Sequence, residues 1–163
     1  MLKPYVCVAC ERVILEQAPE GSPPGTSGVP SLIGLFNRII AIVPPVGQET
    51  LKIAPNAAVP KEWAVFSAWD VEPDDEERKY TVCTQIVYPD QTPFGAISKV
   101  PLKIEPRKRS QNILRVFGFP IGQAGFYKVQ TWIEENEERV FGPIEFKIEL
   151  EIQKQEQAQM VQQ

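Results

Sequence analysis

Histidine is absent from this sequence, and cysteine is scarce, with three residues among 163. Histidine is the side chain most often used for proton transfer near neutral pH, and it is a common ligand of zinc and haem. Its absence excludes Ser-His-Asp triads and the zinc and haem sites that rely on it. Glycine-rich nucleotide-binding loops and the GxSxG and HExxH motifs are missing as well. We therefore predict no catalytic residue, no metal site and no cofactor.

An excess of positive charge and long apolar runs are also lacking. The net charge is -4 and the pI is about 5.0, whereas nucleic-acid binding needs a basic surface. No segment reaches the roughly 18 apolar residues of a membrane span. The N-terminus has no apolar core and cleavage site of a secretory signal. These features predict a cytoplasmic protein without a nucleic-acid or membrane partner.

The three cysteines do not complete a known site. Cys7 and Cys10 form a CxxC pair, but Cys83 is the only other cysteine, so a zinc site would need a carboxylate ligand. Residues 5–15 have the composition of a strand, on which residues three apart point to opposite faces. We therefore predict buried structural thiols, since free cysteine behaves as a small apolar residue.

Sixteen prolines divide the chain into short extended pieces. Apolar and β-branched runs alternate with turn signals, and no crossover helix separates them. This pattern predicts an all-β fold, an antiparallel β-sandwich of about seven to nine strands. The expected strands cover residues 5–15, 62–71, 79–88, 97–104, 112–119, 126–134 and 144–152, and a further short strand could lie at 51–53.

Residues 30–43 fit two structures. Their apolar positions from Leu32 onward match the stripe of an amphipathic helix. The alternative, a strand, is favoured by Gly34, by the β-branched run 39–43 and by the prolines on both sides. We predict a strand here.

The segment 144–152 alternates apolar and charged residues without a break. Because successive side chains of a strand point to opposite faces, this pattern predicts a strand with one buried face. The buried side is expected to hold Ile144, Phe146, Ile148, Leu150 and Ile152, and the wet side Glu145, Lys147, Glu149 and Glu151.

The preceding strand carries the spacing of a tyrosine corner, in which a tyrosine hydroxyl bonds to backbone a few residues upstream. Gly125 and Tyr127 mark the corner, and Val129 stands where an immunoglobulin domain has its second cysteine. Trp63 or Trp69 is expected to fill the central core position. We predict one immunoglobulin-like domain over residues 1–152, followed by a glutamine-rich tail at 153–163.

Four short motifs of packing and turn residues are spread along the chain: Ala9-Cys10-Glu11, Leu32-Ile33-Gly34-Leu35-Phe36-Asn37-Arg38-Ile39, Tyr88-Pro89-Asp90 and Gly125-Phe126-Tyr127. With these motifs the whole chain resembles an uncharacterised family of small bacterial single-domain β-sandwich proteins. The resemblance implies the fold, and it implies no activity, cofactor or site residue.

The outer face of the expected strand 126–134, which carries the tyrosine corner, is the first candidate for an interaction surface. If Tyr127 points inward, the even-numbered residues point outward. Aromatic residues on the outside of a sheet indicate a docking surface unless a loop or strand covers them. The candidate interface residues are Phe126, Lys128, Gln130 and Trp132.

Three functions follow from these patterns. The leading hypothesis is a non-catalytic structural or adaptor protein that binds a protein partner or itself. The alternative is a sandwich that binds a small ligand or calcium through its loops, with the acidic residues 70–77 as the cation site, although they lack the regular spacing of a calcium loop. The third is a carboxylate-based enzyme. The basic turn 107–109 carries too few charges to indicate phosphate binding.

Overall fold

The computed structural model describes residues 2–15, 30–43, 53–72, 78–102, 104 and 109–154. Strands fill most of these residues, and the described part of the chain contains no helix. The strands are β1 (Lys3–Leu15), β2 (Pro30–Leu35), β3 (Arg38–Val43), β4 (Ala58–Asp70), β5 (Tyr80–Val87), β6 (Pro93–Pro101), β7 (Ser110–Pro120), β8 (Gly125–Glu135) and β9 (Glu138–Lys154).

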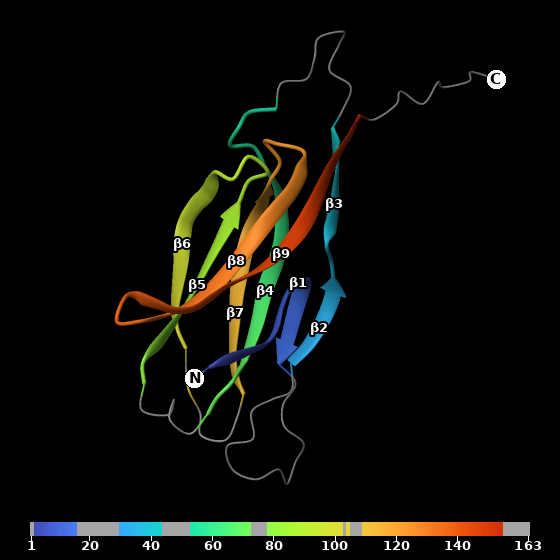
Figure 1. Ribbon diagram of the computed structural model, residues 1–163. Helices are drawn as coiled ribbons and strands as arrows, with labels where there is room; N and C mark the ends of the chain where they lie inside the picture. The colour runs from blue at the N-terminus through green and yellow to red at the C-terminus, as the bar shows by residue number, and fades with distance from the viewer. Residues whose placement is uncertain are drawn as a thin grey trace, which may run out of the picture.

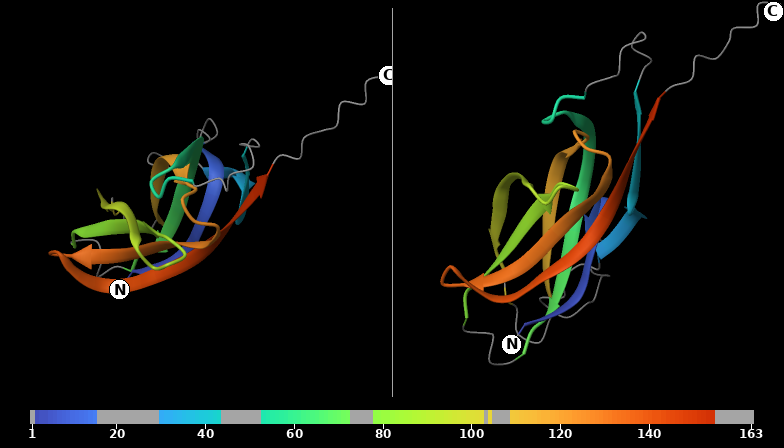
Figure 2. Two further views of the ribbon diagram at one scale, coloured as in Figure 1. Left: turned by 90° about the horizontal axis from the view of Figure 1, so that it is seen from above. Right: turned by 45° about the horizontal axis from the view of Figure 1, so that its top comes forward.

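The strands form two sheets (Figure 1). One sheet has four strands in the order β2-β1-β4-β7, and the other has five in the order β3-β9-β8-β5-β6. Seen from above, the sheets lie as two layers (Figure 2). The prediction of an all-β protein with about seven to nine strands is confirmed.

The expectation that all strands pair antiparallel is wrong at one place. β3 pairs parallel with β9, with Arg38 beside Glu149 and Val43 beside Lys154. β3 follows β2 after only two residues, yet β2 belongs to the other sheet. The chain therefore crosses from one sheet to the other between β2 and β3. The strand beside which β3 then lies, β9, is more than a hundred residues away in sequence, and the two strands run in the same direction. The second sheet is mixed.

The region 30–43 is extended, as predicted, but it forms two strands rather than one. The break lies at Phe36 and Asn37. Just before it, Gly34 has φ +64°, and a Cβ there would lie 2.7 Å from Cγ of Glu11. Glycine is needed at this point because the backbone conformation and the side chain of the opposite strand both exclude a larger residue.

Side chains from both sheets share one hydrophobic core. Trp63 of β4 contacts Phe119 of β7 with ring centroids 5.7 Å apart, and Phe119 contacts Tyr127 of β8 at 5.1 Å. Trp69, which is fully buried, anchors a second cluster with Leu2 and other apolar residues. Both tryptophans are therefore core residues, whereas the sequence predicts this for one or the other of them.

The last strand has the predicted alternation. Ile148 and Leu150 are buried in the core, and Phe146 and Ile152 pack against it. Glu145 and Lys147 on the opposite face are exposed. The strand is longer than predicted, because β9 begins at Glu138 and continues to Lys154, past the start of the expected tail.

Some predicted boundaries change or cannot be compared. β6 begins at Pro93 and ends at Pro101, four and three residues before the expected positions 97 and 104. Ile53 is not in a strand, and residues 51–52 of the suggested short strand lie outside the described residues. Residues 155–163 of the tail also lie outside them.

The outer side of the four-stranded sheet holds a further apolar cluster. Cys10, Ala64, Phe66 and Ala68 are buried there, and Val8 and Ile113 are among the partly buried neighbours. Among the described residues, no third layer of strands packs on this cluster.

Candidate functional site

The predicted docking face on β8 is only partly exposed. Phe126 has 56% of its surface exposed, as expected, whereas Trp132 has 3%. The guanidinium carbon of Arg139 lies 4.7 Å from the Trp132 ring centroid, and Trp132 Nε1 donates a hydrogen bond of 2.9 Å to Glu134 Oε1. The prediction that Trp132 is an exposed interface anchor is therefore wrong, because residues of its own hairpin cover it.

The polar residues of this face are engaged with their neighbours. Lys128 Nζ donates to Gln91 Oε1 at 2.8 Å and lies 3.6 Å from Glu145 Oε1. Gln130 Nε2 donates to Glu145 Oε2 at 3.1 Å. These contacts are those of a hydrated strand surface, so the structure does not single out this face for docking.

Glu134 has the most perturbed carboxylate on this face. Its side chain is 12% exposed, and Lys99 Nζ lies 2.7 Å from Oε2. Hydrogen bonds from Lys99 and then from Trp132 lower the pKa of Glu134 to about 2. Next to it, burial and then a hydrogen bond to Glu134 raise the pKa of the Cys83 thiol to about 11. This thiol is therefore protonated near neutral pH, which argues against a nucleophilic role.

The two other cysteines are also free thiols on opposite sides of β1. Cys7 faces the second sheet, where its Sγ lies 3.7 Å from Oγ1 of Thr131. Cys10 is buried in the outer cluster with Ala64. The described residues contain no group of three or more side chains that could hold a metal ion. The described chain also offers no helix with the length and apolar character of a membrane span.

The predicted cation loop and the basic turn can be compared only at their ends. Residues 73–77 and 105–108 lie outside the described residues. Asp70 Oδ1 accepts a hydrogen bond of 2.7 Å from Arg109 Nε, and Glu72 Oε1 accepts one of 2.7 Å from Lys3 Nζ. Both described carboxylates thus have cationic partners, and calcium binding at 70–77 stays a prediction.

The two motifs around Tyr88 and Tyr127 meet in space. Their rings lie 5.5 Å apart, and Gln123 Nε2 donates to Asp90 Oδ2 at 2.6 Å. The Tyr127 hydroxyl donates a 2.7 Å hydrogen bond to the backbone carbonyl of Gln123, as predicted. Burial raises the pKa of Tyr127 to about 12. These residues join the two turns at one end of the molecule, which is a structural role.

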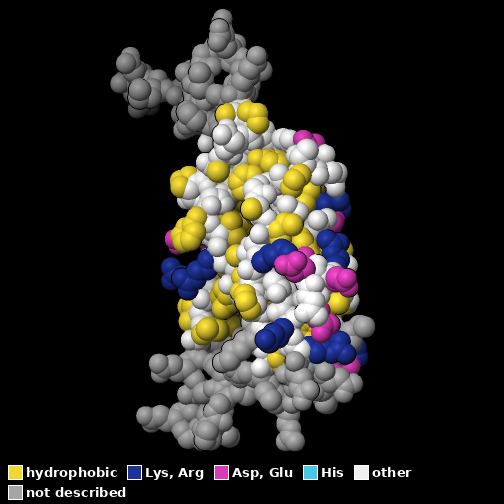
Figure 3. All heavy atoms as spheres, turned by 90° about the vertical axis from the view of Figure 1, so that its left-hand side faces the viewer, with side chains coloured by type: hydrophobic (Ala, Val, Ile, Leu, Met, Phe, Trp, Pro, Cys, Tyr) yellow, Lys and Arg dark blue, Asp and Glu magenta, His cyan; other side chains and the backbone are white. Residues whose placement is uncertain are grey.

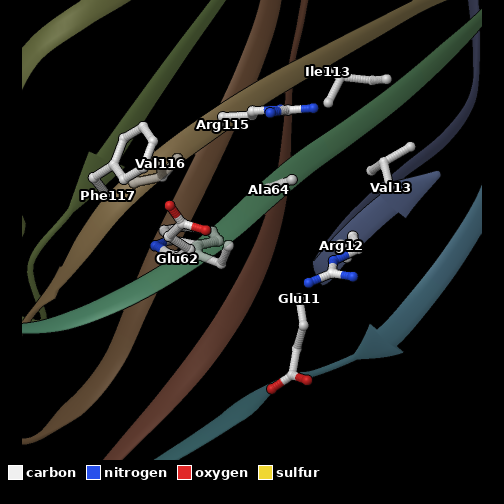
Figure 4. A pocket seen from close by; sticks show the side chains of 10 residues that line it. Glu11, Arg12, Val13, Glu62, Ala64, Ile113, Arg115, Val116 and Phe117 are labelled. Carbon is white, nitrogen blue, oxygen red and sulfur yellow. The ribbon is translucent and has the colours of Figure 1, made fainter. Parts of the chain in front are cut away.

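A hollow of about 290 Å³ lies on the outside of the four-stranded sheet (Figure 4). Ala64 leaves space between the longer side chains of β1 and β7, among them Arg12 and Arg115. Neither arginine has an ion-pair partner among the described residues. Glu62 also lines the hollow, so the hollow carries both positive and negative side chains. Sequence reasoning did not find this hollow, because it arises from the juxtaposition of three strands.

The edges of the sheets differ in how they are protected against further pairing. β6 is bounded by Pro93 and Pro101, and it contains Gly95 with φ +67° and Lys99. Proline, irregular backbone and lysine are devices that prevent another strand from adding to an edge. Apolar side chains are mixed with charged ones on the side of the molecule that carries β6 (Figure 3).

Protective features also occur at both edges of the four-stranded sheet. β2 begins at Pro30 and contains Gly34 in a left-handed conformation. β7 carries the exposed Arg115 and ends at Pro120 after Gly118, which has φ +83°.

β3 is the exception. Its sequence, Arg-Ile-Ile-Ala-Ile-Val, contains neither proline nor glycine and carries one charge, at Arg38. Ile39 and Ala41 are buried in the core, whereas Ile40 is 48% exposed and Ile42 is 66% exposed. No strand of the described chain pairs with β3 on the side away from β9. Within the described residues, the backbone groups on that side therefore have no partner strand.

Other exposed apolar residues lie nearby in the sequence. Six of the eleven large apolar side chains that are exposed in the described part of the chain belong to β1, β2 and β3 beyond residue 13. We call the open side of β3, with Ile40 and Ile42, the β3 edge. The sequence signal that could have found it is the uncharged β-branched run 39–43.

Comparison with models of known protein families and with curated proteins finds no match to this chain.

Proposed function

We propose that the protein is a non-catalytic, immunoglobulin-like β-sandwich of the cytoplasm that acts as a structural or adaptor protein through the β3 edge. The observation that carries the proposal is a six-residue, β-branched edge strand without proline, glycine or an unpaired charge. Three free thiols suit a reducing compartment.

The strand order supports the immunoglobulin-like assignment. The order β9-β8-β5-β6 corresponds to strands G, F, C and C′ of a variable-type domain, and β1-β4-β7 corresponds to A, B and E. Tyr127 near the start of β8 then occupies the position of the tyrosine corner, and its bond to Gln123 fits that role. The assignment leaves β2 and β3 without a counterpart, and Val129 stands at the position of the second cysteine of the disulfide. In addition, Trp63 and Trp69 lie on β4, the counterpart of strand B, whereas the core tryptophan of immunoglobulin domains lies on strand C.

The β3 edge is suited to strand addition. In this mode an extended segment of a partner forms main-chain hydrogen bonds with an open edge, and alternate side chains provide specificity. Ile40 and Ile42 offer an apolar surface on the outer face, and Ile39 and Ala41 hold the strand in the core. An edge with open backbone groups and exposed isoleucine side chains fits a partner segment that is extended, apolar and β-branched.

Affinity purification of the full tagged chain from its native host tests this function. We expect a set of proteins retained by the parent chain to be lost with the variant Ile40→Lys/Ile42→Lys, because lysine side chains on an edge strand oppose the addition of another strand. Ile97→Lys is the matched control, since Ile97 is 41% exposed on β6. Each retained protein is then purified and titrated against the three chains.

The decisive measurement is that titration. An increase of at least about tenfold in Kd for the β3 variant, with the control unchanged, supports the proposal. Equal binding by all three folded chains would overturn it.

A further inference from the structure

We infer that the strand which adds to the β3 edge is β3 of a second copy of this chain, antiparallel, with Ala41 opposite Ala41. This inference rests on the proposed function, because it names the segment that the edge accepts. A second copy is the partner that supplies the chemistry described above, an extended run of isoleucine and other β-branched residues without proline.

Charge does not oppose this pairing. The strand has one charged residue, Arg38, whose guanidinium group contacts Glu151 directly and lies 3.7 Å from Glu149 Oε2. These contacts raise the pKa of Arg38, with the hydrogen bond to Glu151 as the largest cause. Because both acids lie on β9 of the same copy, two β3 strands can approach without bringing two unpaired cations together.

The pleat of the strand restricts the register. Residues directly opposite one another in an antiparallel pair share a face, so a two-fold axis passes beside a residue, and Ile40 and Ala41 are the two central residues of β3. With Ile40 at the axis, Arg38 of each copy lies opposite Ile42 of the other on the outer face. With Ala41 at the axis, Ile40 lies opposite Ile42 on both sides of the axis. The second register covers exposed isoleucine with isoleucine and leaves Arg38 with its acidic partners.

The topology also sets where the assembly ends. A two-fold pairing uses the β3 edge of both copies and joins their five-stranded sheets into one. The far edge of each sheet is β6, which is protected by Pro93, Pro101 and Lys99. A closed dimer therefore forms, and the sheet does not extend into a fibre.

Sedimentation equilibrium of the full chain over about 1 to 100 µM tests the dimer. We expect the parent and Ile97→Lys to approach twice the 18.4 kDa chain mass, and Ile40→Lys/Ile42→Lys to show a Kd at least about tenfold higher. The milder pair Ile40→Thr/Ile42→Thr replaces the lysine variant if circular dichroism shows that the latter is unfolded. A parent that stays monomeric at every concentration, or a dimer that neither β3 variant weakens, overturns the inference.

Disulfide trapping tests the register. Ile40→Cys mixed with Ile42→Cys should form a mixed disulfide under mild oxidation, whereas Ile40→Cys alone should not. The parent, with Cys7, Cys10 and Cys83, is the background control. Efficient trapping of Ile40→Cys with itself would overturn the Ala41 register. A monomeric parent whose β3 edge still binds another protein would leave the proposed function intact, so the two failures can be told apart.

Discussion

At the scale of single residues, position on a strand and exposure are different properties. Phe126 and Trp132 both point to the outer face of β8, yet Phe126 is exposed and Trp132 is covered by Arg139. Tyr127 points inward between them, and its environment is fixed by the Gln123 carbonyl and the Tyr88 and Phe119 rings. Strand alternation predicts the facing of all three residues, whereas the covering of Trp132 depends on a side chain from the next strand.

We predict that Tyr127→Phe lowers the free energy of unfolding by about 1 kcal/mol or slightly more, because a partly buried carbonyl loses its hydrogen-bond donor. Urea unfolding followed by tryptophan fluorescence measures the change. Tyr5→Phe, at a residue that is 57% exposed, is the control and should stay within about 0.5 kcal/mol of the parent. An equal effect of the two substitutions would show that the Tyr127 hydroxyl is not structural.

At the scale of elements, the β8–β9 hairpin depends on an unusual turn. Its two central residues, Asn136 and Glu137, have φ of 51° and 67°, which a two-residue type I′ turn requires. Asparagine adopts this conformation readily, but glutamate does so only at a cost. The turn therefore holds backbone strain at Glu137.

We predict that Glu137→Gly raises the free energy of unfolding by up to about 1 kcal/mol, since asparagine followed by glycine is the favoured sequence for this turn. Thermal or urea unfolding measures the gain. Glu138→Gly, one residue later at the start of β9, should instead lower the stability, because glycine weakens a strand. A loss of stability in both variants would contradict this explanation of the turn.

At the scale of the whole molecule, ion pairs connect residues that are distant in sequence. Lys3 pairs with Glu72, Lys61 with Glu11 and Lys99 with Glu134. Hydrogen bonds from these lysines are the largest causes that lower the pKa of their partners, to about 2 for Glu72 and Glu134. The folded chain therefore releases protons that the unfolded chain would hold in mild acid.

We predict that stability falls as the pH is lowered from about 5 to 2. A carboxylate whose pKa is lower in the folded state than in the unfolded state stabilises the fold above its unfolded pKa, and this contribution is lost as the pH falls through the folded pKa. Urea midpoints at several pH values measure the loss. Glu134→Gln should reduce the slope between pH 5 and 2, and an unchanged slope would refute the role of Glu134.

The sequence by itself determined the strands, and to a large extent their facing. The alternation from Ile144 to Ile152 depends on local geometry, since a strand exposes every second residue whatever its partner is. For the same reason the inward placement of Tyr127 could be predicted, whereas the hydrogen bond from its hydroxyl to the backbone a few residues upstream is predicted from the spacing of a tyrosine corner. The absence of histidine is likewise a property of the sequence alone, and it removes the side chain most often used for proton transfer near neutral pH.

Only the tertiary structure decided which strands are neighbours. The parallel pairing of β3 with β9 joins segments more than a hundred residues apart, and it leaves the other side of β3, with Ile40 and Ile42, as a sheet edge. The cover of Arg139 over Trp132 depends on how side chains of one hairpin pack. Strand pairings follow from how the sheets close around the shared core, and a run of β-branched residues has the same local pattern at an edge and in the middle of a sheet. The candidate site is an edge, so the sequence provided its residues and the fold provided their exposure.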